Sequence, residues 1–536
     1  MAGKNKLNPI IKCDYPDVDV IRVNDTYYMI STTMYFMPGA EILRSYDLLH
    51  WEHAAYVYDR LDSTPGQCLE GEENIYGSGM WAASLRYNRG TYYVCFVCND
   101  TGKTYLYRSE SISGPWIKSN IKGFFHDCSL LFDDDGKVYI AYGNRNVYVA
   151  ELNEDLTATV DADDESKYDP EDKSCSYGKL VVKDDDDATL GYEGSHFYKI
   201  NGRYYLFFIH MPKSTGKRTE SCFVSESPMG EYKGGDVCDD DMGFHNSGAA
   251  QGGIVSTPSG KWYAILFQDS GSVGRLPVLI PVSWENEMPV FGDKGKIPDS
   301  FEIEDLKPGY GYTPLTGSDD FKNDTNDIEK SGSFGFLSRW QFSHEPDLGL
   351  IKHDEKNGTV TVTTGKIANN LVQAKNVLTQ RTHKPDCCAE ITVDGSMLKD
   401  GDYAGLCLLQ SSYGFISLTK REGKIYIVTK KRFIDNGSFW GERNDKDPGE
   451  ETAQISTEGF SDVSKITFGC EADFEDMKDV AAFYYYDSEG KKIYAGGEVK
   501  LKFLLDHFTG ARFGLFVYST KETGGSAEFS DFRMLR

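Results

Sequence analysis

The sequence predicts an all-β protein with more than one domain. The chain has 536 residues, which exceeds the size of about 250–300 residues at which a single hydrophobic core stops growing. Short aromatic and β-branched runs broken by Gly, Asp and Asn dominate, and the periodicity of amphipathic helices is almost absent. Hydrophobic residues make up 40% and aromatic residues 13% of the chain. This apolar content is sufficient for packed cores and excludes general disorder.

A repeat within the first three hundred residues predicts the architecture of the N-terminal domain. Five segments share a polar turn that is followed by an aromatic residue or pair and an apolar strand. The aromatic positions are Tyr27 and Tyr28, Tyr92 and Tyr93, Tyr139, Tyr204 and Tyr205, and Trp262 and Tyr263. Each turn contains the Gly or Asn that a tight hairpin requires. Radial repetition of five hairpin units predicts a five-bladed β-propeller over residues 1–300, with a β-sandwich or a solenoid as the alternative.

The remaining residues predict a linker and a second β-domain. Residues from about 294 to 318 are rich in Gly, Pro, Asp and Lys, which is typical of a connector between domains. We place the linker at residues 301–317. Residues 318–536 contain short alternating strands, for example at 359–363 and 512–518, but they lack the five-unit repeat. We therefore expect an antiparallel β-sandwich over residues 318–536.

The charge and the termini exclude several classes of partner. The chain has 57 Lys and Arg against 83 Asp and Glu, a net charge of −26, so it repels phosphate backbones and we expect no nucleic acid and no membrane as partners. No apolar run reaches the roughly 18–20 residues that span a bilayer. The first residues lack the apolar core of a signal peptide, and the twelve cysteines are scattered. We expect a cytoplasmic protein, although a secreted protein with its signal peptide removed would look the same.

Three carboxylates lie at matching positions of the repeat. Asp17, Asp127 and Glu193 precede the aromatic positions of their repeats by ten to twelve residues, so we expect them on equivalent inner strands around one axis. Because these acids cannot all ionise freely together, one should have a raised pKa. Acid/base hydrolysis requires such a pair, one ionised and one protonated. Each of these acids, taken alone, is explained equally well as a turn cap or as a buried, hydrogen-bonded acid. Asp14 and Asp19 remain alternatives to Asp17, because Asp17 and Asp19 would lie on the same face of an extended strand.

Several motifs follow one another in a fixed order, at residues 8–17, 126–136, 192–196, 250–263, 274–284, 339–347 and 402–410. They resemble those of glycoside hydrolase family 43, in the branch of α-L-arabinofuranosidases and β-xylosidases that carries a C-terminal β-sandwich. The resemblance covers essentially the whole chain. It implies that Asp17 is the general base, that Glu193 is the general acid, and that Asp127 orients this acid and tunes its pKa. The family inverts configuration, which predicts a separation of about 6.5–9.5 Å between the two catalytic carboxyl groups.

The resemblance also implies a set of sugar-binding residues: Met34, Phe36, Trp81, Gln251 and Arg275. A Trp face suits the C–H surface of a sugar and an Arg fork can bind its hydroxyls, although a core Trp and a surface ion pair are the structural alternatives. Ala250 stands where many members have a His near the propeller axis, which in some of them helps to hold a central ion. No acidic loop has a complete calcium pattern. We therefore expect no metal site and no required cofactor, with structural calcium as an unsupported alternative.

The function that the resemblance implies is that of an inverting, exo-acting glycoside hydrolase. We expect it to release terminal α-L-arabinofuranosyl residues, and also β-D-xylosyl residues, from plant hemicellulose or its oligosaccharides. The preference for arabinofuranosides rests on the resemblance of residues 251–253 and 267–275 to that branch. A β-D-xylosidase acting on xylo-oligosaccharides is one alternative. A carbohydrate-binding protein without catalysis, or an interaction scaffold, is the alternative from another class. The oligomeric state is not predicted.

Overall fold

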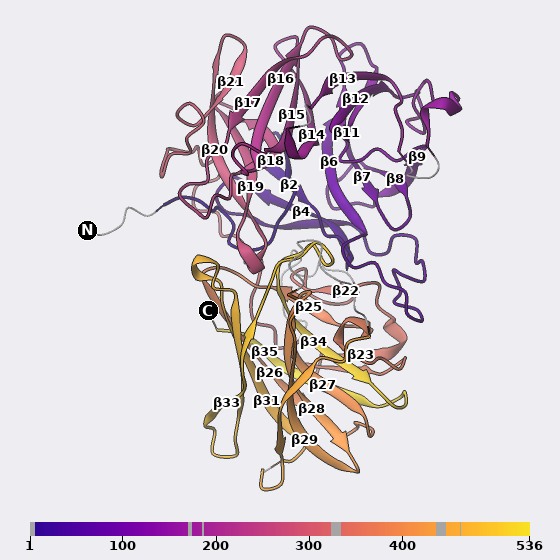
Figure 1. Cartoon of the computed structure of the whole chain (residues 1–536), viewed down its shortest axis with the longest axis vertical. Coiled ribbons are helices and arrows are strands. Elements are labelled where there is room, and N and C mark those ends of the chain that lie inside the picture. Colours follow the sequence, from indigo (N-terminus) through magenta and orange to yellow (C-terminus); the bar gives the residue numbers. More distant parts are fainter. Residues whose placement is uncertain are drawn as a thin grey trace, which may run out of the picture.

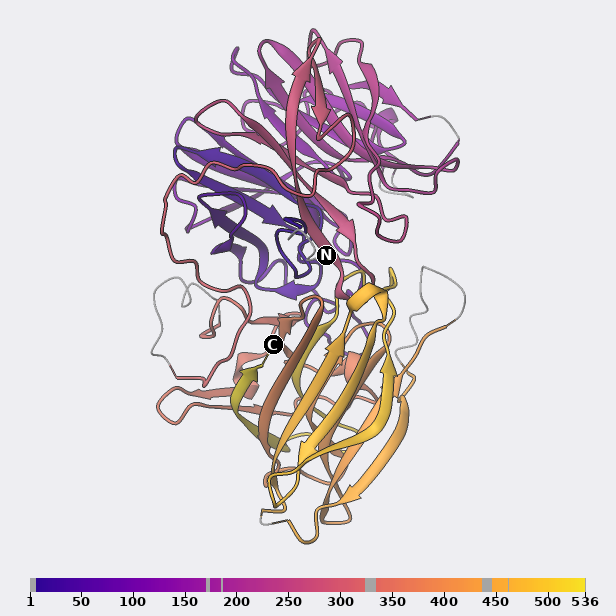
Figure 2. The same ribbon diagram turned by 90° about the vertical axis from the view of Figure 1, so that its left-hand side faces the viewer.

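The computed structural model describes residues 6–169, 174–184, 187–322, 334–435, 446–460 and 462–535. Two β-domains are stacked along the long axis, with the N-terminal domain (indigo to rose) above the C-terminal domain (orange to yellow) in Figures 1 and 2. The described residues form β-strands and a few 3₁₀ turns, which confirms the predicted all-β class. No helix in these ranges is long and apolar enough to cross a membrane.

The N-terminal domain is a five-bladed β-propeller, as predicted. Each blade is a four-stranded antiparallel sheet, and the predicted aromatic positions lie on the second strand of every blade. The blades are β1 (Asp19–Val23), β2 (Thr26–Ser31), β4 (Gly39–Ser45) and β5 (Glu52–Tyr58); β6 (Met80–Asn88), β7 (Thr91–Cys98), β8 (Lys103–Ser109) and β9 (Ile117–Ile121); β10 (Ser129–Phe132), β11 (Val138–Asn144), β12 (Asn146–Glu151) and β13 (Lys179–Lys183); β14 (Ala188–Ile200), β15 (Arg203–Pro212), β16 (Thr219–Ser225) and β17 (Lys233–Cys238); and β18 (Ala250–Ser256), β19 (Trp262–Asp269), β20 (Arg275–Glu285) and β21 (Met288–Phe291).

The apolar runs of the second strands are explained by burial on both faces. Alternate residues of a strand point to opposite faces of its sheet, and each blade packs between two neighbours. On β7, Val94 and Phe96 join the apolar cluster shared with the first blade, whereas Cys95 joins the cluster shared with the third blade. A strand covered on both sides is therefore apolar at nearly every position rather than at every second one.

The first strands of the blades form the innermost ring, in which β1 contacts β6 and β18, and β10 contacts β6 and β14. Arg86 of β6 crosses this ring and ties several blades together. Its Nη1 donates to Asp19 Oδ2 at 2.5 Å, and its Nη2 donates to Ser129 Oγ at 2.7 Å. The Nδ1 atom of His196 lies 3.1 Å from Asp19 Oδ1. Asp19 is therefore a structural acid that neutralises a buried cation at the propeller axis.

Replacing Asp19 with Ala is expected to lower the free energy of unfolding by about 3–5 kcal/mol, because it leaves the Arg86 guanidinium buried without its carboxylate. The measurement is urea-induced unfolding of the full chain. Asp25→Ala provides the control, since Asp25 is exposed in the first hairpin and should change stability by less than about 0.5 kcal/mol. A loss for Asp19→Ala as small as that of the control would contradict the structural role of this acid.

The C-terminal domain is the predicted antiparallel sandwich. One sheet has eight strands, in the order β3 (Phe36–Met37), β22 (Gln341–Ser343), β25 (Leu378–Arg381), β34 (Arg512–Ser519), β27 (Asp402–Leu409), β28 (Tyr413–Arg421), β29 (Lys424–Arg432) and β30 (Glu450–Ser456). The other has seven, in the order β23 (Ile351–Asp354), β24 (Thr359–Thr363), β35 (Ser526–Met534), β26 (Asp386–Asp394), β31 (Lys465–Asp473), β32 (Val480–Tyr486) and β33 (Lys492–Lys500). Fully buried side chains such as Leu406, Phe468 and Phe513 fill the space between the sheets.

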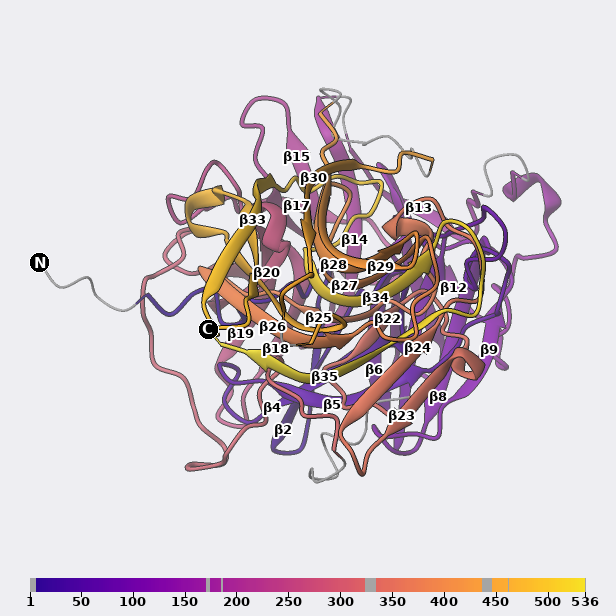
Figure 3. The same ribbon diagram turned by 90° about the horizontal axis from the view of Figure 1, so that it is seen from below.

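The two domains share strands and buried charges, and the view from below shows the sandwich lying over the propeller (Figure 3). Strand β3 belongs to the propeller part of the chain but pairs with β22 of the sandwich. Arg381 and Glu41 form a buried ion pair of 2.8 Å between the domains. Asp14 accepts hydrogen bonds of 2.8 Å from the backbone N–H groups of Arg275 and Gly510, one in each domain. These contacts fix the sandwich against one end of the propeller.

Candidate active site

The three carboxylates selected from the sequence lie on or next to innermost strands. Asp17 and Asp127 each precede the first strand of their blade by two residues, and Glu193 lies within β14 next to two register shifts of that strand. The φ angles of Asp17 and Asp127 are 52° and 48°, in the left-handed region that costs non-glycine residues free energy and that is enriched at functional sites. The propeller therefore holds both Asp side chains in an unusual backbone conformation at one end of the inner ring.

All three acids line one cavity of about 430 Å³, a volume within the usual range of about 300–1,000 Å³ for small-molecule sites. Three of the predicted sugar-binding residues, Trp81, Gln251 and Arg275, line the same cavity. Leu505 and Phe508 of the sandwich also line it. The second domain therefore contributes to the walls of the site.

The Asp17 carboxylate is held by a buried arginine. Arg275 Nη1 donates to Asp17 Oδ1 at 2.8 Å, and its guanidinium lies 4.3 Å from the ring centre of Phe508 and 4.7 Å from that of Phe267. Burial alone would lower the pKa of Arg275, but the Asp17 and Asp269 carboxylates raise it above its usual value. Arg275 thus stays charged and fixes the orientation of Asp17.

The structure distinguishes Asp17 from its two neighbours. Asp17 lines the cavity. Asp19 instead pairs with Arg86 at the propeller axis, and Asp14 accepts hydrogen bonds from two backbone N–H groups at the domain interface. The expectation that Asp17 and Asp19 share one face assumed an extended strand. The positive φ of Asp17 breaks that alternation and turns the two carboxylates to different surroundings.

Glu193 is contacted by two donors on one oxygen. Asn144 Nδ2 donates a short hydrogen bond to Glu193 Oε2, and His126 Nε2 lies 3.3 Å from the same atom. Burial lowers the pKa of His126, but the carboxylates of Asp127 and Glu193 outweigh it and raise this pKa to about 9. The imidazole is therefore protonated at neutral pH and orients Glu193 together with Asn144.

Asp127 has the raised pKa that was predicted for one of the three acids. Its Oδ2 atom accepts a hydrogen bond of 3.1 Å from the Gly194 N–H, next to Glu193 in the chain. Burial, together with the charges of Glu193 and Asp17, raises the pKa of Asp127 to about 7, against the opposing effect of His126. Asp127 therefore changes its protonation near neutral pH, directly beside the residue expected to act as the acid.

Asp127→Asn is expected to flatten the dependence of stability on pH between about pH 4 and 7. In this range the unfolded chain has released the Asp127 proton while the folded protein still binds it, so the contribution of Asp127 to the free energy of unfolding falls as pH rises. Asn does not titrate and removes this contribution. Thermal midpoints measured at four pH values check the prediction, with Asp134→Asn on an exposed turn as the control. An unchanged slope in Asp127→Asn would contradict the raised pKa.

His126, Asp127 and Glu193 together form a set of side chains that could bind a metal ion. Among the described residues, one group of three such side chains has ligand atoms that all lie within 4.8 Å of one another, and it consists of His126, Asp127 and Glu193. This chemistry suits a transition metal, but the group contains Glu193, so a bound cation would compete with the proton of the expected acid. The expectations of no required cofactor and of an axial site without calcium remain predictions.

Two of the predicted sugar-binding residues lie elsewhere. Met34 and Phe36 are buried in an apolar cluster that joins the propeller to the sandwich, and neither lines the cavity. The Arg512 guanidinium of the sandwich lies 3.5 Å from the ring centre of Phe36. Their position in the first blade suggested the sugar site, but the docked second domain covers them, so the structure assigns them to the interface.

Several residues that line the cavity were not predicted from the sequence: His126, Asn144, Arg218, Leu505 and Phe508. His126 directly precedes Asp127, and this adjacency to a predicted acid was an available signal. Phe508 lies 5.7 Å from Trp81, ring centre to ring centre, although the two residues are more than four hundred positions apart. No local pattern reveals such a contact, because it depends on how the domains dock.

Two oriented carboxylates line one cavity at the end of the propeller, one held by Arg275 and the other by Asn144 and His126. This is the kind of carboxyl pair that glycoside hydrolysis uses. Comparison with known families specifies the class further. Residues 6–289 match the model of glycosyl hydrolases family 43, and residues 335–535 match the model of the beta xylosidase C-terminal concanavalin A-like domain. The chain belongs to glycosyl hydrolase family 43.

Individual relatives have different activities in their names. A beta-xylosidase of Formosa agariphila is 28% identical over 392 residues, which cover 68% of this chain and 62% of that protein. A non-reducing end alpha-L-arabinofuranosidase of Bacteroides ovatus is 25% identical over 462 residues, which cover 81% of this chain and 80% of that protein. A solved structure described as a bifunctional GH43-CE protein of Bacteroides eggerthii has a TM-score of 0.85 and 36% identity, and covers 100% of this chain and 64% of that chain. The chain thus spans less than two thirds of the first and third of these proteins.

Proposed function

We propose that this protein is an inverting, exo-acting glycoside hydrolase. It releases terminal α-L-arabinofuranosyl residues, and also β-D-xylosyl residues, from hemicellulose oligosaccharides. The observation that best supports this proposal is that Asp17 and Glu193 line a single cavity whose walls include Leu505 and Phe508 of the sandwich. A cavity walled by both domains accepts the end of a sugar chain, whereas cleavage within a chain requires an open groove.

The residues divide the reaction between them. Glu193 donates its proton to the glycosidic oxygen as the bond from this oxygen to the anomeric carbon breaks. Asp17 accepts a proton from a water molecule, whose oxygen forms the new bond on the opposite face of the sugar, so that the anomeric configuration inverts. Arg275 holds Asp17 in place for this step, and Asn144 and His126 orient Glu193. Asp127 accepts a hydrogen bond from the N–H that follows Glu193, and its own charge changes with pH beside the acid.

Two measurements test this proposal. Initial rates on aryl α-L-arabinofuranoside and aryl β-D-xylopyranoside identify the preferred terminal sugar. Proton NMR of the first turnovers identifies the anomer released, and inversion predicts that a β-xyloside yields α-xylose first. Release of the β-anomer would refute inversion, and no hydrolysis of either glycoside would refute the proposed substrates.

The second candidate is a β-D-xylosidase acting on xylo-oligosaccharides. The beta-xylosidase named among the relatives, at 28% identity, favours it over an enzyme restricted to arabinofuranosides. The ratio of the two initial rates decides between the candidates. A rate on the xyloside at least about tenfold above that on the arabinofuranoside would favour the β-D-xylosidase.

A further inference from the structure

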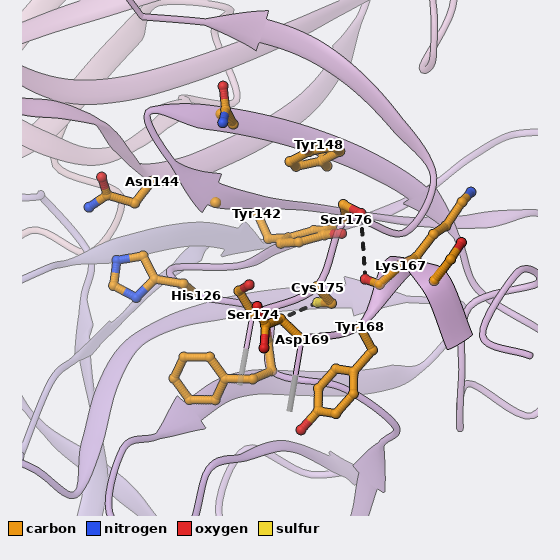
Figure 4. A pocket seen from close by; sticks show the side chains of 14 residues that line it. His126, Tyr142, Asn144, Tyr148, Lys167, Tyr168, Asp169, Ser174, Cys175 and Ser176 are labelled. Carbon is orange, nitrogen blue, oxygen red and sulfur yellow. Dashed lines mark hydrogen bonds between the residues drawn. The ribbon is translucent and has the colours of Figure 1, made fainter. Parts of the chain in front are cut away.

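A second cavity, of about 620 Å³, adjoins the catalytic one and is drawn in Figure 4. His126 and Asn144 line both cavities. These are the two side chains that contact the Oε2 atom of Glu193. The second cavity therefore begins beside the carboxyl group that the proposed mechanism assigns to the leaving group.

The second cavity is lined by aromatic rings on two sides. Tyr142 and Tyr148 of the third blade have ring planes within 22° of each other and ring centres 5.8 Å apart. Tyr168 lies across the cavity from these two rings (Figure 4), and it is 39% exposed, whereas Tyr142 is buried. Aromatic faces offer large, rigid contact area for the C–H faces of sugar rings. Asn146 and Ser176 add polar groups to the lining.

An insertion in the third blade builds the outer wall. Residues 152–178 connect β12 to β13, whereas short turns connect the third and fourth strands of the other four blades. Connections longer than about 12–15 residues are uncommon in compact domains, and many of them are functional. The wall-forming residues Tyr168, Ser174, Cys175 and Ser176 all belong to this insertion.

The described part of the insertion is attached to the blade by specific hydrogen bonds. Tyr142 Oη donates to the Tyr177 carbonyl at 2.9 Å, and the Gly178 N–H donates to Asp161 Oδ2 at 2.7 Å. Lys167 is also paired with Asp161, at 2.6 Å, so its charge is already compensated. These bonds hold the described part of the insertion in place before a ligand binds, which reduces the entropy cost of binding. Because Lys167 is already paired, it does not favour an anionic ligand over a neutral one.

We propose that this cavity is a leaving-group subsite that binds the second and third sugar units of a neutral pentose oligosaccharide. The terminal sugar occupies the catalytic cavity, the scissile oxygen lies at Glu193, and the rest of the chain passes His126 and Asn144 to reach the slot between Tyr148 and Tyr168. This proposal rests on the proposed function. It adds that the enzyme selects its substrates by the units behind the scissile bond.

The test compares an oligosaccharide with an aryl glycoside of the same terminal sugar, for example xylotetraose with 4-nitrophenyl β-D-xyloside. Tyr168→Ala is expected to lower the ratio of the two kcat/KM values at least about tenfold, and Asn146→Trp, which fills the slot, should lower it similarly. Tyr87→Ala is the matched control, because Tyr87 is 43% exposed and lines neither cavity. Thermal midpoints show whether each variant is folded. An unchanged ratio in both slot variants would overturn the subsite.

Failure of the subsite and failure of the proposed function give different results. If the aryl pentosides are cleaved but the slot variants keep the wild-type ratio, the subsite is wrong and the function stands. If no pentoside is cleaved, the proposed function is wrong, and calorimetric titration of xylotetraose into wild type and Tyr168→Ala then tests the slot by itself. Weaker binding by the variant supports the slot, whereas equal binding or no binding by the wild type overturns it.

Discussion

Asp17→Asn is expected to lower kcat on aryl pentosides by about 10²- to 10⁴-fold, the range typical of a lost general base. An amide cannot accept the proton of the attacking water at neutral pH. The substitution is otherwise conservative, because the Asn carbonyl oxygen can still accept the hydrogen bond that Arg275 Nη1 makes at 2.8 Å. Asn also tolerates the positive φ of 52° better than most residues. The fold should therefore survive the change.

The control for this experiment is a carboxylate that does not line the cavity. Asp134→Asn changes an exposed acid and should keep wild-type kcat. Thermal midpoints of both variants should lie close to that of the wild type, which separates lost chemistry from lost structure. Full activity of Asp17→Asn would show that another group activates the water, and Asp17 would then not be the base.

The propeller could be predicted from the sequence because its information is local. Each blade contains a hairpin whose turn, aromatic pair and strand lie within a few tens of residues, and β2, β7, β11, β15 and β19 each begin at or just before the predicted aromatic positions. The exchange of β3 into the sandwich sheet was not predictable in this way. Strand β3 is only two residues long and pairs with β22, some three hundred positions away, so no local pattern identifies its partner.

The sequence predicted those site residues that a local pattern marks. Asp127 and Glu193 could be selected because a carboxylate within an apolar strand sequence is unusual. Both also lie at a similar distance before the aromatic positions of their repeats. The residue pattern alone could not separate Asp17 from Asp19, because the separation depends on one positive φ angle; the family resemblance favoured Asp17. Phe508 could not be found at all, because it reaches the cavity from the second domain. Docking of the domains likewise turned Phe36 from an expected sugar contact into part of the interface.

Glu193→Gln is expected to reduce activity to an extent that depends on the leaving group. A sugar hydroxyl is a weak acid and leaves only as it is protonated, so kcat on an unmodified pentose oligosaccharide should fall by about 10²- to 10⁴-fold. 2,4-Dinitrophenol is a much stronger acid and leaves as its anion, so the loss on dinitrophenyl pentosides should be below about tenfold. The Gln amide is nearly isosteric, and its carbonyl oxygen can still accept the hydrogen bond from Asn144.

Asp17→Asn is the informative comparison for this variant, because water must be activated whatever the leaving group is. It should therefore lose at least about 10²-fold on both substrates, whereas Glu193→Gln should recover most of its activity on the dinitrophenyl glycoside. Equal losses of Glu193→Gln on the two substrates would contradict its assignment as the acid. Rescue of Asp17→Asn by the better leaving group, with none for Glu193→Gln, would exchange the two roles. A pair of kcat measurements on two substrates thus assigns acid and base independently of which pentose the enzyme prefers.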